Sequence, residues 1–380
     1  MTDLTEIDEK YACSDTLGMA CTSEKTDFSV WSPMADAVTL NIYRSCKSRR
    51  VQIRLPMQKS EFGVWRQSVN GDLDGRYYTY TFHFGSTERE APDIYSRSAG
   101  ANGRRSMIFS ETSVMIDGWE NDRPVKLRSA ADAVIYELHI RDFSMDQNAD
   151  FSARGKLIAI CEEGVKNSLG DSAGIGHLKQ LGITHVHLLP LMQNASVNDL
   201  KPQFNWGYDP FLYNVPEGSY CTDPCDGASR IRELRTLVKT LHSNGIGVIL
   251  DVVYNHTYTV ESSPFTAAFP HYYYRHDDKG YSNGSGCGNE LATERRMVSR
   301  FIRDSLCALA RDYHIDGFRF DLMGLMDINT LNDCAKALRD INPEILLYGE
   351  GWTGGISPLP EELRAMKHHA DRTDGGAMFS

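Results

Sequence analysis

Residues 247–256, Gly-Val-Ile-Leu-Asp-Val-Val-Tyr-Asn-His, decide the fold of this 380-residue chain. A near-continuous apolar run that ends in polar residues is typical of a strand buried on both faces of a sheet. Further segments have the same character, and helix-length or longer stretches separate them: residues 133–139, 183–189, 317–322 and 345–350. Because buried strands alternate with helices, the sequence predicts a parallel sheet covered by helices.

Apolar residues at helical spacing fill several of the intervening stretches. Helices are predicted over residues 229–243, 290–313 and 330–341, the first ending at Asn244-Gly245. Two architectures fit this pattern: an open doubly wound sheet or part of a (β/α)8 barrel. No G-x-G-x-x-G or G-x4-G-K-[ST] motif follows a strand, which weakens the nucleotide-binding version of the open sheet.

The first third of the chain has a different pattern. Short alternating segments at 28–31, 37–43, 51–55 and 76–84 are separated by turn signals, which is typical of a small β-sandwich. We therefore expect a lead segment over residues 1–25, a β-sandwich over 26–117, and an α/β domain with about five strands over 118–380.

Polar residues gather where three of the predicted strands end. Because the carboxyl ends of parallel strands meet at one edge, these residues are expected to converge at one mouth of the sheet. They are Asp251, Asn255, His256, Arg319, Asp321 and Glu350.

Two carboxylates on neighbouring strands, one of them beside an arginine, suit glycoside hydrolysis. Arg319 lies two residues before Asp321, so both side chains face the same side of the strand. The guanidinium is expected to keep Asp321 ionised as a nucleophile. Glu350 has no such partner in the sequence and is expected to hold the proton for the leaving group. The structural alternative is a set of ion pairs that brace the mouth, but charges at one end of three apolar runs favour function.

Composition excludes several other functions. The formal net charge is −11 and no long basic block occurs, which argues against a nucleic-acid surface. No apolar stretch is long enough to span a membrane, and the acidic N-terminus does not resemble a signal peptide. The nine cysteines lack zinc spacing and are expected to be reduced, so a cytoplasmic protein is predicted.

Other catalytic chemistries have weaker support. No H-E-x-x-H motif supports a metal site, and no G-x-S-x-G motif supports a serine nucleophile. The glycine-rich segment 284–288 is expected to be a loop whose backbone approaches the site. No cofactor is expected for the chemistry. A structural Ca²⁺ is left open, because no oxygen-rich loop is specific enough to place one.

Several short motifs in the sequence resemble those of a known family. Residues 251–256 (DVVYNH), 317–324 (GFRFDLMG) and 348–350 (YGE) are similar to three conserved regions of the α-amylase superfamily, glycoside hydrolase family 13. Residues 204–210 (FNWGYDP) resemble the more specific YNWGYDP signature of type I pullulanases, with Phe204 in place of the first tyrosine. Residues 284–295 are similar to another pullulanase segment. Residues 28–43 resemble the start of a glycogen-binding β-sandwich module.

The resemblance implies a (β/α)8 barrel and hydrolysis of α-1,6 bonds in branched α-glucan polysaccharides or oligosaccharides by a retaining mechanism. In that mechanism Asp321 is the nucleophile, Glu350 is the acid and base, and Arg319 holds Asp321. The resemblance also implies two groups of substrate-binding residues. The first group, around one subsite, is Asp251, Asn255 and His256. The second group, in the FNWGYDP loop, is Tyr208, Asp209 and Trp206. For Trp206, packing in the core is an equal alternative.

The sequence departs from the family pattern at one place. The superfamily has a fourth region, with a histidine and a third carboxylate after a later strand, and no candidate for it follows residue 350. The chain is therefore expected to be C-terminally truncated and inactive or poorly folded alone. Alternatives are an α-1,4-acting or branching enzyme of the same superfamily and a non-catalytic glucan-binding fragment. Trp31 and Trp65 are candidate sugar platforms on the sandwich, with core packing favoured for Trp31.

Overall fold

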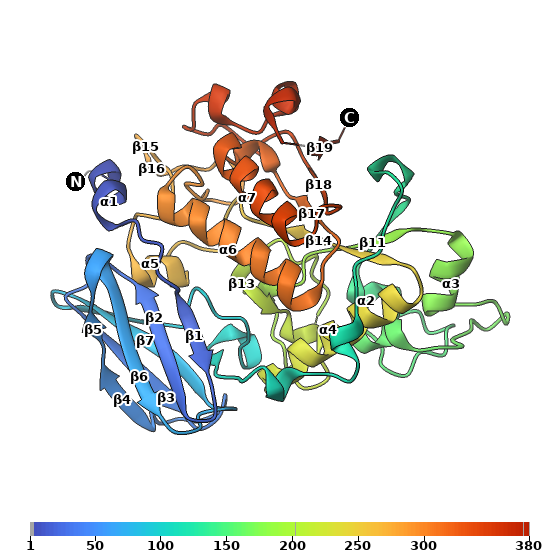
Figure 1. The fold of residues 1–380 in the computed structure, drawn as a ribbon, viewed down its shortest axis with the longest axis horizontal. Helices are drawn as coiled ribbons and strands as arrows, with labels where there is room; N and C mark the ends of the chain where they lie inside the picture. The colour runs from blue at the N-terminus through green and yellow to red at the C-terminus, as the bar shows by residue number, and fades with distance from the viewer. Residues whose placement is uncertain (1–3, 202, 375, 380) are drawn as a thin grey trace.

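A computed structural model describes residues 4–201, 203–374 and 376–379. Two antiparallel sheets form a β-sandwich, and a parallel sheet with helices packed against it follows in the chain (Figure 1). One sandwich sheet has the order β1-β2-β6-β5, and the other has the order β4-β3-β7-β8 with β9 beside β7. Their bounds are β1 (Gly18–Cys21), β2 (Lys25–Trp31), β3 (Ala37–Tyr43), β4 (Ile53–Pro56), β5 (Gln58–Lys59), β6 (Val64–Asn70), β7 (Tyr77–Phe84), β8 (Thr87–Ala91) and β9 (Ser106–Met107).

The sandwich core consists of the inward residues of these strands. Phe28, Leu40, Tyr78 and Tyr80 are almost completely buried, and the Phe28 and Tyr78 rings meet edge to face at 5.0 Å. Residues 18–21, which the sequence assigns to a lead segment, form strand β1 and pair with β2, so they belong to the sandwich. The domain boundaries as a whole remain predictions.

Trp31 and Trp65 are both buried and cannot serve as exposed sugar platforms, which overturns that expectation for Trp65. Their exposed fractions are 3% and 5%. The Trp31 indole donates to the Tyr11 carbonyl at 2.9 Å, and the Trp65 indole donates to the Ser32 carbonyl at 2.8 Å. Each ring therefore packs in the core with its N–H satisfied.

The second domain contains six parallel strands in the order β10-β11-β14-β17-β18-β19. This is an incomplete TIM barrel, as predicted, and the predicted positions of five strands are confirmed. The sixth, β19, is a two-residue strand that the sequence pattern did not reveal, because it is too short for any periodicity. The strand bounds are β10 (Ile135–Leu138), β11 (His185–Leu188), β14 (Gly247–Val252), β17 (Gly317–Phe320), β18 (Leu346–Gly349) and β19 (Ala377–Met378).

Helices and two small hairpins complete the domain (Figure 1). Helix α4 begins after Asp226, whose side chain accepts a hydrogen bond from the Ala228 amide, and ends before Asn244. Helix α1 (Leu4–Tyr11) precedes the sandwich, and the α-helices of the second domain are α2 (Ile140–Phe143), α3 (Gly174–Leu181), α4 (Gly227–Ser243), α5 (Pro264–Ala268), α6 (Arg296–Tyr313) and α7 (Ile328–Ile341). The hairpins pair β12 (Met192–Asn194) with β13 (Pro210–Pro216) and β15 (His276–Asp277) with β16 (Gly280–Tyr281).

Helix α6 begins at Arg296, so the prediction that it starts at residue 290 is wrong. Buried side chains before it hold the chain extended. Glu290 is buried and pairs with Arg275 at 3.4 Å, and the Leu291 amide donates to the Asn255 carbonyl at 2.9 Å. These tertiary contacts override the local helical pattern.

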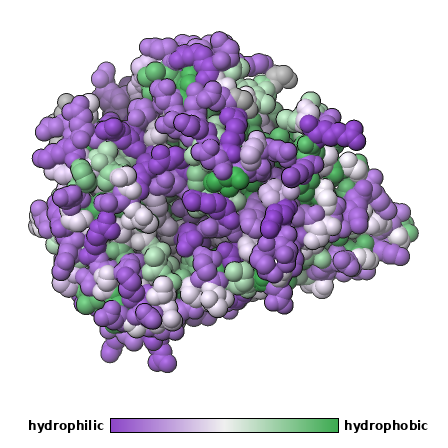
Figure 2. All heavy atoms as spheres, in the orientation of Figure 1, coloured by the Kyte–Doolittle hydropathy of each residue, from purple (hydrophilic) through white to green (hydrophobic). Residues whose placement is uncertain are grey.

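The sandwich packs directly on the barrel. The Ser32 hydroxyl donates to the Ala268 carbonyl at 2.6 Å, and the Tyr77 hydroxyl donates to the Cys225 carbonyl at 2.5 Å. The Trp31 ring lies 4.9 Å from the Tyr272 ring. The two domains are therefore joined by buried contacts. Figure 2 shows that the visible face of the molecule is mostly hydrophilic, with small separated apolar patches.

Candidate active site

The register of the parallel sheet places the predicted polar residues in two layers. Asp251, Arg319 and Tyr348 are paired neighbours on β14, β17 and β18. Phe320 and Gly349 form the next pair along these strands, and Asp321 and Glu350 each follow that pair by one residue. The prediction that these strand ends converge is therefore confirmed by the pairing, and both carboxylates stand at the carboxyl-terminal mouth of the sheet.

Arg319 contacts all three carboxylates of the cluster. Its Nη1 lies 2.9 Å from Asp251 Oδ1 and 2.9 Å from Asp321 Oδ1, and its Nη2 lies 2.5 Å from Glu350 Oε1. The guanidinium is mostly buried, with 8% of its side chain exposed. One cation thus fixes three anions in a mostly buried site, where charge-assisted hydrogen bonds are strong.

Arg319 acts to lower the pKa of Asp321, as expected, but the net pKa is raised, contrary to the expectation of a lowered value. Burial of the Asp321 carboxyl raises its pKa, the negative charge of Asp251 raises it further, and the two together outweigh Arg319. The resulting pKa of Asp321 is about 6. Asp321 is therefore ionised at neutral pH, but with a smaller margin than an aspartate on the surface.

Glu350 also differs from its predicted environment, because it does have a cationic partner in Arg319. Its second oxygen, Oε2, accepts a hydrogen bond from the Leu322 amide at 3.0 Å. Leu322 has a positive φ of 41°, a left-handed conformation that is uncommon for leucine. The residue after the predicted nucleophile thus holds the predicted acid, and the backbone there is strained in the way often found at functional sites.

Asn255 and His256 follow β14 and support Asp321 from one side. The Asn255 side-chain amide donates to Asp321 Oδ2 at 2.7 Å and to the Asp321 carbonyl at 3.0 Å. His256 Nδ1 lies 2.5 Å from Asn255 Oδ1, and the His256 ring is buried. Burial lowers the pKa of His256 to about 4, so this imidazole is neutral at pH 7.

The FNWGYDP loop reaches the same cluster. The Tyr208 hydroxyl donates to Asp251 Oδ2 at 2.7 Å, which connects the loop to the Arg319 network. Asp209 is half-buried, and its Oδ2 accepts a hydrogen bond from the side-chain amide of Asn205 at 3.3 Å. Trp206 is 62% exposed, so the alternative that it packs in the core is wrong.

Sequence reasoning missed two histidines in this region. His139 follows β10, and its Nε2 lies 2.8 Å from the Asn205 carbonyl and 3.0 Å from the Tyr220 hydroxyl, so it supports the FNWGYDP loop. His187, on β11, is buried with Nε2 at 3.4 Å from Asp251 Oδ2. His139 ends the apolar run of β10, which was an available signal, whereas His187 lies inside β11 and is followed by apolar residues, so no such signal marked it.

The glycine-rich loop at 284–288 lies beside the site, as expected. The Gly355 amide donates to the Gly284 carbonyl at 2.7 Å, which joins this loop to the segment after Glu350. A Cβ on Gly354 would lie 2.3 Å from the Ser285 carbonyl oxygen, so only glycine permits this approach. Within the described residues no group of three or more His, Cys, Asp or Glu side chains is arranged to hold a metal ion, and no helix is long and apolar enough to cross a membrane.

Comparison with known proteins identifies relatives of both domains. Residues 16–96 match the model of carbohydrate-binding module 48 (isoamylase N-terminal domain). A pullulanase of Bacillus subtilis (strain 168) is 39% identical over 377 residues, which cover 98% of this chain and 51% of that protein. Pullulanase 1, chloroplastic, of Arabidopsis thaliana is 34% identical, over 92% of this chain and 41% of that protein.

Solved structures give the same result. The pullulanase of Paenibacillus barengoltzii, in complex with maltohexaose and α-cyclodextrin, superposes with a TM-score of 0.95 at 42% identity, over 99% of this chain and 59% of that one. The pullulanase of Anoxybacillus sp. LM18-11, complexed with maltotetraose, gives a TM-score of 0.94 at 39% identity, over 99% of this chain and 55% of that one. The chain is thus a homologue of the pullulanases of glycoside hydrolase family 13 and spans about half the length of the curated relative from Bacillus subtilis.

Proposed function

We propose that this chain carries the nucleophile and the acid of a debranching glycoside hydrolase that cleaves α-1,6-glucosidic bonds in branched α-glucans. The observation that carries the proposal is the Arg319 guanidinium, which holds Asp321 and Glu350 together at adjacent strand ends. Paired carboxylates of this kind suit a retaining reaction, in which one attacks and the other transfers a proton.

In the proposed first step, an Asp321 carboxylate oxygen attacks the anomeric carbon of the glucose at the branch. The bond from that carbon to the leaving 6-oxygen breaks, and Glu350 gives its proton to that oxygen. The product is a β-glucosyl ester on Asp321. Asn255 and Arg319 orient the attacking carboxylate through the hydrogen bonds described above.

In the second step, Glu350 takes a proton from a water molecule, and the water oxygen attacks the same anomeric carbon. The ester bond to Asp321 breaks, which restores the carboxylate and leaves the α-configuration of the sugar unchanged. The Leu322 amide and Arg319 keep Glu350 in place through both proton transfers. No cofactor takes part in either step.

The FNWGYDP loop supports the choice of an α-1,6 bond over an α-1,4 bond. Residues 204–210 resemble the pullulanase signature, and Tyr208 is fixed against Asp251 in the site. The aromatic faces of Tyr208 and the exposed Trp206 are suited to pack against sugar rings. Relatives that span more of the barrel are named pullulanases, and two were solved with maltohexaose or maltotetraose bound.

The test measures new reducing ends from pullulan and from linear amylose. Two proteins are compared: the 380-residue chain, and the same chain joined to the remaining barrel strands of the Bacillus subtilis relative. The joined protein is expected to cleave pullulan and not amylose. Asp321→Asn should abolish cleavage, whereas Asp333→Asn, on the exposed surface of α7, should preserve it.

Equal cleavage of amylose would instead favour an α-1,4-acting enzyme. Binding of pullulan without cleavage by the joined protein would favour a non-catalytic glucan-binding role. Either result would refute the proposed activity.

A further inference from the structure

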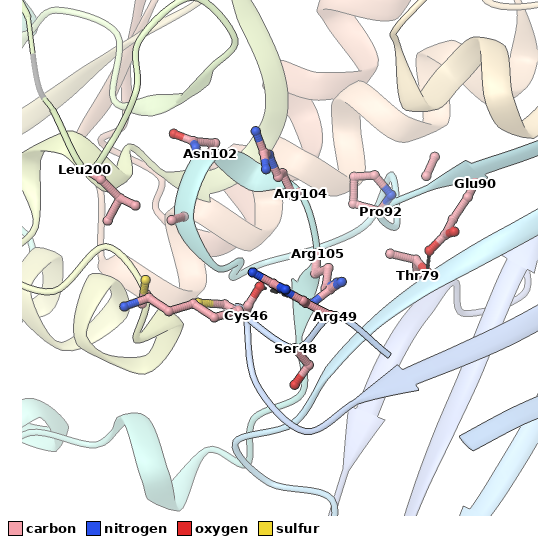
Figure 3. A pocket seen from close by; sticks show the side chains of 14 residues that line it. Cys46, Ser48, Arg49, Thr79, Glu90, Pro92, Asn102, Arg104, Arg105 and Leu200 are labelled. Carbon is pink, nitrogen blue, oxygen red and sulfur yellow. Dashed lines mark hydrogen bonds between the residues drawn. The ribbon is translucent and has the colours of Figure 1, made fainter. Parts of the chain in front are cut away.

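A cavity of about 620 Å³ lies where the sandwich meets the barrel, away from the active site. Its walls come from the loop after β3, from β7 and β8, from residues 101–105, and from Leu200 and Cys225 of the barrel (Figure 3). Cavities of this size hold small organic ligands. The cavity is thus large enough for a sugar with a charged substituent.

The lining of the cavity is strongly cationic. Lys47, Arg49, Arg104 and Arg105 line it, whereas Glu90 is the one acidic residue among them. Within the described part of the chain, none of these four basic side chains forms a salt bridge. In a protein with a net charge of −11, this local excess of unpaired positive charge marks a site for an anion.

Arg105 is held in a fixed orientation. Its guanidinium lies 3.6 Å from the centroid of the Tyr43 ring, and its Nη1 donates to the carbonyls of Ser45 at 3.2 Å and Cys46 at 3.1 Å. Stacking and backbone contacts therefore fix the plane of the group while its other N–H groups remain available. A fixed guanidinium is well suited to the oxygens of a phosphoryl group.

The other side of the cavity carries groups that recognise hydroxyls. The Thr79 hydroxyl and the Tyr43 hydroxyl both donate to Glu90 Oε1, at 2.6 Å and 2.5 Å. Figure 3 shows Thr79 and Glu90 together on one side of the pocket, with Arg49 and Arg105 beside them and Arg104 further along. Among the residues that the structure describes, the hydrogen bonds to Glu90 go to Oε1, so Oε2 can accept hydrogen bonds from sugar hydroxyls.

We propose that this cavity binds a phosphorylated sugar. The phosphoryl group contacts Arg49, Arg104 and Arg105, and the hydroxyls of the attached ring contact Glu90. Two sources share this chemistry: a free hexose phosphate, and a phosphate ester carried on a glucan chain. The inference concerns binding only and does not depend on the proposed hydrolysis.

The site also contacts the segment that leads to the FNWGYDP loop. Asn102 lines the cavity, and its backbone N–H donates to Asp199 Oδ2 at 2.6 Å. Arg230, which is fully buried, bonds both Asp199 and the Gly100 carbonyl at 2.9 Å. A ligand in the cavity would therefore touch both domains, so its binding should raise the thermal midpoint of unfolding.

Isothermal titration of the 380-residue chain with glucose 6-phosphate tests the proposal, with glucose and inorganic phosphate as separate titrants. Glucose 6-phosphate should bind more tightly than either. Arg104→Gln and Arg49→Gln should each weaken binding roughly tenfold, as expected for the loss of one charge-assisted contact. The matched control is Arg50→Gln, which removes the same charge beside the cavity without lining it. Thermal melts of each variant without ligand verify that the fold is intact.

A phosphorylated maltodextrin and its dephosphorylated form distinguish the two sources. Tighter binding of the phosphorylated polymer than of glucose 6-phosphate would assign the site to a glucan chain, and the reverse would assign it to a free hexose phosphate. The proposal is overturned if glucose 6-phosphate does not bind, if Arg50→Gln weakens binding as much as Arg104→Gln, or if inorganic phosphate binds as tightly as the sugar phosphate.

Discussion

Arg319 Nη1 lies 2.9 Å from Asp321 Oδ1, and the same guanidinium also contacts Asp251 and Glu350. Removal of this cation would leave three clustered carboxylates without their shared partner. We expect Arg319→Met to lower the free energy of unfolding by about 3 kcal/mol, the usual cost of breaking a buried ion pair. Urea denaturation at pH 7 measures this change.

The control for that experiment is Arg303→Met on α6. Arg303 is 43% exposed and lies 3.4 Å from Asp304, so its loss should cost less than about 1 kcal/mol. If the two variants lose equal stability, Arg319 does not have the role assigned to it.

The raised pKa of Asp321 predicts a pH-dependent effect of its substitution. A carboxyl whose folded pKa is about 6, against 3.8 for the ordinary group, disfavours the folded state above pH 6. Asp321→Asn should therefore stabilise the chain at pH 7.5 by roughly 2 kcal/mol. That gain should shrink as the pH falls from about 6 towards 4, because folded wild-type Asp321 then becomes neutral.

Denaturation at a series of pH values measures the difference between wild type and Asp321→Asn. Asp333→Asn, on the surface of α7, is the control and should show little difference at any pH. A gain for Asp321→Asn that does not change between pH 4 and pH 8 would contradict a raised pKa. The same protonation should make the hydrolysis rate of the joined protein fall below pH 6.

His242 connects two buried aspartates at the amino-terminal end of the barrel strands. Its ring nitrogens lie 2.9 Å from Asp122 and 2.8 Å from Asp316. Burial alone would lower the pKa of His242, but the hydrogen bonds to Asp122 and Asp316 outweigh it and raise that pKa to about 9. Because the folded pKa is above the ordinary 6.5, this stabilisation is complete below pH 6.5 and is lost as the pH rises through 9.

We expect His242→Gln to lower the free energy of unfolding by about 2–3 kcal/mol at pH 6 and by much less at pH 10. Chemical denaturation at both pH values gives the comparison. His177→Gln, on α3, is a control histidine outside this network. A loss that is as large at pH 10 as at pH 6 would show that the charge of His242 does not stabilise the fold.

Trp206 should contribute to glucan binding and little to stability. Because its ring is 62% exposed, Trp206→Ala should leave the thermal midpoint almost unchanged. If the ring packs against sugar, the affinity of the joined protein for a branched maltodextrin should fall about three- to tenfold, or about 1 kcal/mol. Phe62→Ala removes an aromatic side chain of the sandwich that is 48% exposed and serves as the control. An unchanged affinity in Trp206→Ala would remove this residue from the site.

The sequence predicted the parallel strands well because their apolar runs reflect burial on both faces. It also placed Asp251, Arg319, Asp321 and Glu350 together, since the carboxyl ends of parallel strands must meet. The contact of Arg319 with Glu350 could not be predicted, because it depends on the register of β17 against β18, which the sequence does not give. The start of α6 was misjudged, since Glu290 is held by tertiary contacts that no local pattern records.

The protonation of Asp321 shows a second limit of sequence reasoning. Arg319 and Asp251 were both expected near Asp321, but the sequence did not show that burial of the carboxyl and the charge of Asp251 together outweigh Arg319 in setting the pKa of Asp321. The role of His139 depends on Asn205, which is distant in the chain and approaches it only in the folded loop. Such residues are found by distance in space and not by spacing in sequence.

The most direct test of the central claim is to trap the covalent intermediate on the joined protein with 5-fluoro-α-D-glucosyl fluoride. This reagent forms a slowly hydrolysed ester with the nucleophile of a retaining α-glucosidase. Mass spectrometry of the digested protein should find the added sugar on Asp321. The label should be absent from Asp321→Asn and present in Asp333→Asn. A label on Glu350 or Asp251, or no label from a preparation that hydrolyses pullulan, would contradict the assignment of Asp321 as the nucleophile.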